Sequence, residues 1–415
     1  MKVIVIGAGI GGLALALELN KAGIDVQVFE SVKTLTPLGV GINVLPHAMR
    51  NLTRLGVAEA LCEVAIETRE LVYYNQFGQR VGGEPRGRFA GYESPQLSIH
   101  RGELQMVLLH EVQRRLGKDA VVTGHHLESF RETADGKVVA HFVNRETGEP
   151  AGEATGDALI AADGIHSMVR AHFYPEEGAP RWNGEIFWRA TTVGEPFLTG
   201  ASMSIAGHAR RRFMAYPISR KLADQGKALI NWVACLRVDP GQGYRRENWN
   251  RSGTIDDFFH HFGDWRFDWL DIPSVIKNAE VVLEYPCVDR DPVERWTFGR
   301  VTLLGDAAHA MYPMGSNGAS QSILDAECLA NELKSGKDIP SALQAYEAKR
   351  REVTAQIVYR NRNEGPSVVL SIAEQRAPNG FQDGKSVISP REFDEISSGY
   401  KQLTGSDLAS VNRPA

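Results

Sequence analysis

The sequence predicts an α/β fold in which a doubly wound domain is interrupted by a β-rich domain and followed by a C-terminal helical region. Three observations support this fold class. A strand, a glycine-rich turn, a helix and a second strand open the chain within residues 2–30. Strand-like runs dominate residues 182–292. The buried-strand pattern returns at residues 301–304, before two long helical stretches.

Length and composition are those of a globular protein with two or three domains. The chain has 415 residues, of which 43% are hydrophobic and 23% are charged. A formal net charge of −5 excludes a globally basic nucleic-acid-binding protein. We expect no membrane-spanning helix, because long apolar runs are missing. The four cysteines form no C-x-x-C pair, so we expect no metal site and a reducing, cytoplasmic location.

The first β-α-β unit carries a glycine motif. Residues 2–6 and 25–30 are apolar runs typical of parallel strands, and residues 13–22 favour a helix that ends before Gly23. The turn between them reads G-x-G-x-x-G. Its first glycine permits a tight turn, its second lets a pyrophosphate approach, and its last lets helix and strand pack closely. These are Gly7, Gly9 and Gly12, with Gly11 beside the last and Glu30 placed to bind a ribose hydroxyl. The pattern predicts a Rossmann-type dinucleotide site but does not distinguish NAD from FAD.

Further elements follow the same patterns. A helix is expected at residues 103–116, and Asp135 and Gly136 suit a hairpin turn. In the β-rich domain we expect strands at 186–193, 202–206, 212–218, 228–238 and 281–285, and a helical piece near 254–262. Five of the seven tryptophans lie between Trp182 and Trp265, which predicts an aromatic lining for a pocket.

The expected domain limits follow from these elements. The doubly wound domain takes residues 1–75, 97–178 and 285–335. The β-rich domain takes 76–96 and 179–284, and a C-terminal helix and tail take 336–415.

Two later motifs distinguish FAD from NAD. Residues 161–170 read AADGIHSMVR, and residues 305–313 read GDAAHAMYP, which leads to Asn317-Gly318-Ala319. Together with the first glycine motif, they resemble the three signatures of class A flavoprotein monooxygenases, the family of 4-hydroxybenzoate and salicylate hydroxylases. Within the family, stretches such as PLGVGINVLP (37–46) and YPCVDRDP (285–292) are most similar to the phenazine hydroxylases of pyocyanin synthesis. The resemblance covers about residues 1–365.

The resemblance implies FAD as cofactor, with Arg101 pairing with phosphate, Asp306 accepting ribityl hydroxyls and Asp163 ordering the pyrophosphate region. The helix that starts near Gly318 would direct its N-terminus to the flavin N1/O2 edge. The full implied FAD set is Gly7, Gly9, Gly11, Gly12, Glu30, Val40, Gly41, Arg101, Leu127, Asp163, Asp306, Gly318 and Ala319. Tyr216, Pro313 and Gly318 are the implied catalytic positions.

Substrate contacts are expected from the β-rich domain. Arg212, Met214 and Tyr216 recur at every second residue of one strand, so they share a face. Core packing is an equally good interpretation of Tyr216. Trp188, Met203 and Met314 are further candidates. We interpret His309 as a buried, hydrogen-bonded side chain rather than a base, and Lys349-Arg350-Arg351 as an exposed helix face. Cys235 is expected to be inert.

The resemblance also implies the reaction. NADPH or NADH reduces FAD, oxygen adds at flavin C4a, and the hydroperoxide transfers a hydroxyl group to an electron-rich aromatic or heteroaromatic ring. Because phenazine and salicylate hydroxylases remove a carboxyl group, we expect a bicyclic or tricyclic aromatic carboxylate and decarboxylation. Two alternatives stay open: a reductase or halogenase of the same superfamily, and a non-catalytic flavin-binding sensor. The sequence leaves the oligomeric state and the choice of nicotinamide open.

Overall fold

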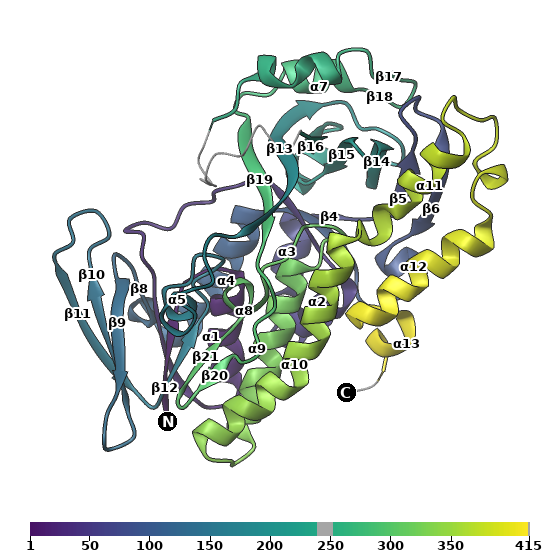
Figure 1. The fold of residues 1–415 in the computed structure, drawn as a ribbon. Helices are drawn as coiled ribbons and strands as arrows, with labels where there is room; N and C mark the ends of the chain where they lie inside the picture. The colour runs from purple at the N-terminus through teal and green to yellow at the C-terminus, as the bar shows by residue number, and fades with distance from the viewer. Residues whose placement is uncertain (239–251, 414–415) are drawn as a thin grey trace.

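A computed structural model describes residues 1–238 and 252–413. Its first sheet has six strands in the order β20-β21-β12-β1-β2-β8 (Figure 1). All neighbours in it run parallel except the β20–β21 pair. The strands are β1 (Lys2–Ile6), β2 (Asp25–Phe29), β8 (Val121–Val122), β12 (Ala158–Ala161), β20 (Thr297–Phe298) and β21 (Val301–Leu303).

This sheet is buried between two layers. One layer contains the helices α1 (Ile10–Lys21), α4 (Arg101–Leu116) and α9 (Gly318–Lys334), which pack on one another. The other is a three-stranded antiparallel sheet of β9 (His126–Glu132), β10 (Val138–Val143) and β11 (Pro150–Gly156). Val3, Ile4 and Val5 of β1 are fully buried, as expected of a strand covered on both faces. The predicted Rossmann-type α/β domain is therefore confirmed, but an antiparallel sheet covers the face where a doubly wound sheet would carry a second layer of helices.

The second sheet has seven strands in the order β19-β13-β16-β15-β14-β5-β6. Three separate chain segments supply them: β5 (Glu70–Tyr74) and β6 (Arg80–Pro85), then β13 (Arg181–Gly194), β14 (Ser202–His208), β15 (Arg211–Pro217) and β16 (Ala228–Arg237), and finally β19 (Leu283–Asp289). Because β5 and β19 pair into this sheet, its segments extend past the limits expected at residues 75/76 and 284/285. The helical piece expected near residues 254–262 consists of two 3-10 turns, Ile255–Asp257 and Phe259–His261.

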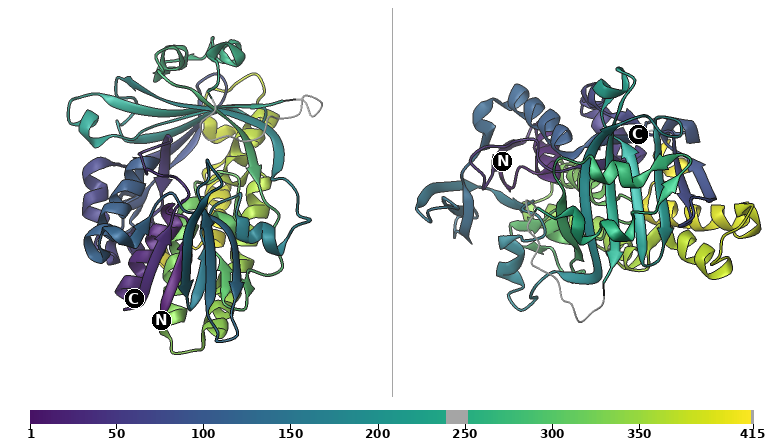
Figure 2. Two further views of the ribbon diagram at one scale, coloured as in Figure 1. Left: turned by 90° about the vertical axis from the view of Figure 1, so that its left-hand side faces the viewer. Right: turned by 90° about the horizontal axis from the view of Figure 1, so that it is seen from above.

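The two faces of the second sheet have different neighbours. Figure 2 shows the sheet lying across the first domain, with α7 (Ile272–Lys277) above its outer face. Trp188, Trp232 and Trp265 pack in the core of that outer face. The inner face instead carries Phe187 and Val233, which pack with Tyr312 of the first domain. The predicted aromatic lining is therefore wrong for these tryptophans, since they cover the face turned away from the cofactor domain.

A small sheet and several helices connect the two domains. β3 (Gly41–Val44), β7 (Leu97–His100) and β4 (Ile66–Glu67) form the small sheet. The remaining helices and short elements are α2 (Pro46–Arg54), α3 (Ala58–Val64), α5 (Met168–Phe173), α6 (Arg220–Ala223), α8 (Asp306–His309), β17 (Arg266–Phe267) and β18 (Leu270–Asp271), of which β17 and β18 lie beside α7 on the outer face of the second sheet.

The C-terminal region is folded rather than a loose tail. After the long helix α10 (Ile339–Arg362), the chain forms α11 (Val368–Arg376), α12 (Pro390–Thr404) and α13 (Leu408–Val411) (Figure 1). Leu370, Val387 and Phe393 are buried there against the β5–β6 side of the second sheet. Among the described residues, no helix is long and apolar enough to cross a bilayer.

Candidate functional site

The glycine turn after β1 has the close approaches that its motif requires. Gly7 has φ +102°, and its N–H donates to the Phe29 carbonyl at 2.8 Å. A Cβ on Gly12 would lie 2.0 Å from the Gly7 oxygen, and one on Gly11 would lie 2.9 Å from a Leu304 methyl. A Cβ on Gly9 would have no neighbour within 4 Å. Gly9 therefore borders open space at the start of α1, where a phosphate can approach the backbone.

The N-terminus of α1 is suited to an anion. No side chain caps it and no acidic residue occupies its first turn, so its free N–H groups and positive potential face that open space. Beside it, the Glu30 carboxylate accepts hydrogen bonds from the Ala8 and Val32 N–H groups at 2.9 and 3.0 Å. These bonds fix the orientation of the Glu30 carboxylate directly after β2.

Arg101 and Asp306 provide opposite charges at the starts of α4 and α8. Arg101 begins α4, and its N–H donates to the Val40 carbonyl at 2.9 Å. Asp306 begins α8 directly after Gly305, which has φ +62°. Burial lowers the pKa of Arg101, and the Asp306 carboxylate opposes that shift. The two groups are close enough to interact but form no ion pair, so both remain available to a ligand.

A buried hydrogen-bond network supports the turn that precedes Asp306. The His309 ring contacts the Asp325 carboxylate at 2.6 Å, and Arg350 donates to the same carboxylate at 2.7 Å. Although burial opposes it, the two cationic or donor neighbours lower the pKa of Asp325 to about 2. Asp325 also accepts the Gly305 N–H at 3.1 Å, which ties the network to the turn before Asp306. The interpretation of His309 is confirmed. The exposed face predicted for Arg350 is wrong, because only 11% of its side chain is exposed and it pairs with the buried Asp325.

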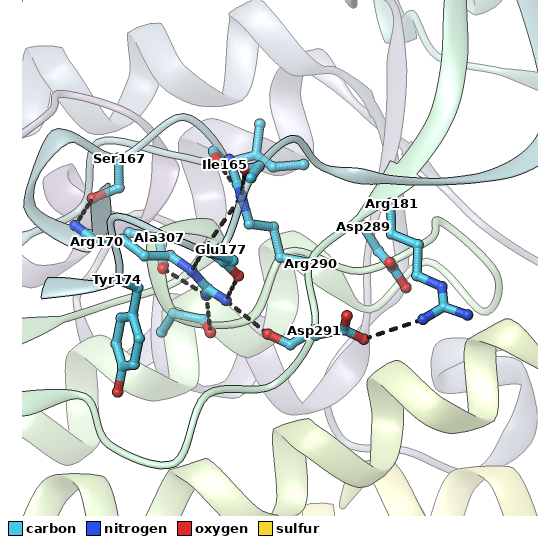
Figure 3. Close-up of polar contacts among 12 residues, drawn as sticks. Ile165, Ser167, Arg170, Tyr174, Glu177, Arg181, Asp289, Arg290, Asp291 and Ala307 are labelled. Carbon is cyan, nitrogen blue, oxygen red and sulfur yellow. Dashed lines mark hydrogen bonds and ion pairs between the residues drawn. The ribbon is translucent and has the colours of Figure 1, made fainter. Parts of the chain in front are cut away.

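Asp163 and Arg170 have different positions. The Asp163 carboxylate accepts the Met168 N–H at 2.8 Å through one oxygen, while its other oxygen is buried without a partner. Burial raises the pKa of Asp163 to about 6. Arg170 is fully engaged, donating to Glu177 and to the Ala307, Ala308 and Asp291 carbonyls (Figure 3). Arg170 thus ties this segment to the turn that carries Asp306.

The loop of residues 312–318 leads from α8 into the start of α9. Gly315 and Ser316 have φ +78° and +57°, and Asn317 leaves the N-terminus of α9 without a side-chain cap or an acidic residue in the first turn. Pro313 is exposed, and Gly318 and Ala319 are half-buried. Leu127, by contrast, lies in the hydrophobic core of the first domain.

The substrate candidates divide between the two faces of the second sheet. Tyr216 and Met203 pack together on the inner face, and Met214 and Met314 meet in a neighbouring cluster there. Trp188 stacks on Phe258 in the outer core, with ring centroids 4.9 Å apart. The strand alternation that places Phe187 inward turns Trp188 outward, so the placement expected for Trp188 is wrong.

Arg212 is buried on the inner face but is already neutralised. Its guanidinium pairs with Glu185 at 2.7 Å, and both side chains are buried. The Cys235 thiol lies 3.5 Å from Arg212 and 3.6 Å from the Glu185 carboxylate. Cys235 is a free, buried cysteine, and burial raises the pKa of its thiol, which agrees with the expectation that it is inert.

Asn231 and Arg189, which were not predicted, connect the second sheet to Gly41 of β3. The Asn231 side chain accepts the Gly41 N–H at 2.6 Å, and Arg189 donates to the Gly41 carbonyl at 3.1 Å. The Nε of Arg189 is buried without a hydrogen-bond partner. A charged residue within the apolar run of residues 186–193 was the signal that could have identified Arg189.

The residues fit a dinucleotide that carries two phosphates. Phosphates can approach the open space at Gly9 and the uncapped N-terminus of α1. Polar groups of the cofactor can bind the charged side chains of Arg101 and Asp306 and the Asp163 oxygen that has no hydrogen-bond partner. Residues 1–238 and 252–413 contain no cluster of three or more metal-ligating side chains.

Removing the Asp306 carboxylate should lower flavin content. Asp306 is exposed, so Asp306→Ala should leave folding unchanged. Loss of one hydrogen bond to a charged group should weaken FAD affinity by about 10- to 100-fold. Flavin content after purification and titration of the stripped chain with FAD measure this. Glu395→Ala, an exposed change on α12, serves as the control. Equal flavin content in the two variants would contradict the role of Asp306.

Comparisons with known proteins agree with this site. The FAD binding domain family matches residues 1–183 and 287–361. The chain is 48% identical over 364 residues to the phenazine 1,6-dicarboxylic acid hydroxylase of Lysobacter antibioticus, which covers 87% of this chain and 89% of the relative. It is 32% identical over 355 residues to the aurachin C monooxygenase/isomerase of Stigmatella aurantiaca, with 85% of each covered.

A solved structure shares the whole fold. The Klebsiella pneumoniae HpxO complex with FAD and uric acid superposes with a TM-score of 0.71 at 24% identity, over 97% of this chain and 92% of that one. The match to the family model and the identity to the Lysobacter relative establish the assignment. The chain belongs to the FAD binding domain family and is a class A flavin-dependent monooxygenase.

Proposed function

We propose that this chain hydroxylates a bicyclic or tricyclic aromatic carboxylate, with FAD as cofactor, NADPH or NADH as reductant and O2 as co-substrate. The substrate ring would lie between the flavin and the inner face of the second sheet. The observation that carries the proposal is the buried, unpartnered Nε of Arg189 on that face.

Arg189 differs from the other two arginines of the site. Arg212 is neutralised by Glu185, and Arg101 faces Asp306. Within the described residues, no carboxylate pairs with Arg189, whose one hydrogen bond goes to the Gly41 carbonyl. Arg189 is half-buried with its Nε fully buried, and a partly desolvated cation without a counter-ion is stabilised when an anion joins it. A carboxylate on the substrate would supply that anion through a charge-assisted hydrogen bond.

The remaining inner face suits an aromatic ring. Met203, Met214 and Phe187 are apolar, and sulfur–aromatic contacts are favourable. Burial raises the pKa of Tyr216 to about 12, so its hydroxyl stays protonated and can donate a hydrogen bond at neutral pH. Few polar groups in an apolar pocket are enough to orient a flat substrate.

The FAD itself is assigned as follows. Its phosphates would lie at the Gly7–Gly12 turn and Arg101, its ribose at Glu30, and its ribityl chain at Asp306. The flavin edge would lie near Val40, Gly41, Pro313, Gly318 and Ala319, where the α9 N-terminus favours negative charge. When bound, FAD supplies the oxygen-activating chemistry. The protein binds, orients and excludes water.

The relatives support a carboxylated ring. The Lysobacter relative acts by name on a phenazine dicarboxylic acid, and another relative, 28% identical, is a 3-hydroxybenzoate 6-hydroxylase of Polaromonas naphthalenivorans. We propose that hydroxylation at the carboxyl-bearing carbon is completed by loss of carbon dioxide. The bond from ring to carboxyl carbon breaks, and its electron pair stays in the ring as the new C–O bond forms.

Turnover under ¹⁸O-labelled oxygen with collection of carbon dioxide tests the proposal. We expect one labelled oxygen in the product and one carbon dioxide per product formed, with phenazine carboxylates as the first substrates tried. A labelled product that keeps its carboxylate would reject decarboxylation alone. NAD(P)H oxidation that no aromatic compound accelerates would favour the sensor, and a halogenated product would favour a halogenase.

Tyr216→Phe should affect coupling more than cofactor binding. The change removes one hydroxyl and keeps the ring that packs against Met203. We expect hydrogen peroxide released per NADPH consumed to rise by about fivefold, the equivalent of one lost hydrogen bond, while FAD affinity changes little. Peroxide and product assays measure the ratio. An unchanged ratio would return Tyr216 to the core-packing interpretation.

A further inference from the structure

We infer that the C-terminal region beyond the family match controls the position of the flavin-facing loop, through the hydroxyl of Tyr400. The family model ends at residue 361, and Tyr400 lies on α12. This inference rests on the proposed placement of the flavin beside residues 312–318.

Tyr400 contacts both backbone and side chains of that loop. Its hydroxyl oxygen lies 2.8 Å from the Met314 carbonyl, and the Asn317 side-chain amide donates to it at 3.2 Å. The side chain also fills the space over Gly315, where an added Cβ would lie 2.3 Å from the Tyr400 hydroxyl. One side chain of the tail thus contacts three of the residues that precede α9.

A second amide connects the same hydroxyl to the start of the loop. The Asn361 Oδ1 atom lies 2.7 Å from the Tyr400 hydroxyl, while its Nδ2 donates to the Tyr312 carbonyl at 2.9 Å. The phenol has one proton for two acceptors, the Met314 carbonyl and Asn361. Burial raises the pKa of Tyr400, so this proton is retained. The network therefore fixes Tyr312, Met314 and Asn317 relative to α12.

The loop needs such support because its backbone is unusual. Gly315 and Ser316 both have positive φ, and Ser316 is not a glycine, so the surrounding structure must maintain this conformation. Further along, Gln321 of α9 donates to the Thr404 carbonyl at 3.1 Å, at the end of α12. The tail thus holds both the loop and the first turn of the helix that would face the flavin edge.

Tyr400→Phe tests this as a positioning role, and Tyr92→Phe is the matched control. Tyr92 is also buried and also holds the tail, since its hydroxyl donates to the Ser406 carbonyl at 2.7 Å. It lines the same cavity as Gly315 and Asn317, but among the described residues its hydroxyl makes no hydrogen bond to residues 312–318. Tyr92→Phe loses one buried hydrogen bond to the tail, whereas Tyr400→Phe loses the bonds of its hydroxyl to Met314, Asn317 and Asn361, so both variants should lose thermal stability and Tyr400→Phe should lose more. If Tyr400 only stabilised the fold, hydrogen–deuterium exchange of residues 312–318 and the FAD absorption bands would be the same in the two variants.

Hydrogen–deuterium exchange of residues 312–318, in FAD-stripped and FAD-loaded chain, is the first readout. We expect exchange there to increase about fivefold in Tyr400→Phe and to stay at the wild-type rate in Tyr92→Phe. The visible absorption bands of bound FAD should shift in Tyr400→Phe only. Asn361→Leu, which removes the amide that links Tyr400 to Tyr312, should likewise increase exchange of residues 312–318 and shift the FAD bands.

Wild-type exchange and an unshifted flavin spectrum in Tyr400→Phe would overturn the inference, as would equal changes in Tyr92→Phe. The exchange measurement on stripped chain needs no substrate. It therefore stands apart from a failure to find a hydroxylated product, which would count against the proposed function alone.

Discussion

Gly12→Val is expected to abolish FAD binding. A Cβ at this position would lie 2.0 Å from the Gly7 oxygen and 3.4 Å from the Ala162 Cβ, so even the first atom of the new side chain has no room. The start of α1 must then move away from the glycine turn, and the N–H groups that face the phosphates lose their direction. Overpacking of this kind costs about 3 kcal/mol or more of stability, and if FAD binding must restore the displaced turn, its affinity falls by at least about 100-fold, beyond what survives purification. Flavin content after purification and isothermal titration of FAD into the stripped chain measure the loss.

Two glycine substitutions control for this prediction. Gly399→Ala adds a methyl group in open space within α12, so flavin content should match the wild type. Gly9→Ala also adds a methyl group in open space, but at the phosphate approach, so the stripped chain should fold normally and bind FAD more weakly. A Gly12→Val chain that retains full flavin would show that the pyrophosphate does not approach this turn.

The first domain could be predicted closely because its signals are local. Gly7 and Gly12 meet steric requirements that few other residues could meet, and they fix where β1 ends and α1 begins. The predicted helix from residue 13 begins at Ile10, and Gly23 follows its end with φ +75° as expected. Glu30 directly follows a buried strand, whereas Asp306 lies three residues beyond the end of β21 and was predicted from the resemblance of the GDAAHAMYP motif.

The second domain was harder because its faces depend on neighbours that are distant in sequence. Period two places Arg212 and Tyr216 on one face but does not say which face meets the cofactor domain. Trp188 was misplaced for this reason. Arg350 was misplaced because its acidic partner, Asp325, lies on another helix. The polar composition after Gly365 concealed α12, whose buried face is only a narrow stripe.

The position of Arg189 also depends on contacts between elements that are distant in sequence. We expect Arg189→Met to weaken substrate binding without destabilising the fold. The change keeps an unbranched side chain but removes the charge. No carboxylate is left unpaired by it, because among the described residues Arg189 has only the Gly41 carbonyl as a partner. Stability and flavin content should therefore stay close to those of the wild type. Arg212→Met would instead remove the cation that pairs with the buried Glu185 carboxylate, which should cost about 3–5 kcal/mol of stability.

The expected effect of Arg189→Met lies in the Michaelis constant. Loss of a charge-assisted hydrogen bond of about 1.5–3 kcal/mol should raise KM for an aromatic carboxylate by about 10- to 100-fold. For the same ring without its carboxylate, KM should be unchanged between wild type and variant, and Arg189→Lys should recover part of the loss because the charge returns without the planar fork. Steady-state kinetics on the matched pair of substrates decides this. An equal rise for both ring compounds would show that Arg189 serves the Gly41 loop rather than a substrate carboxylate, because only a direct charge contact can tell the two compounds apart.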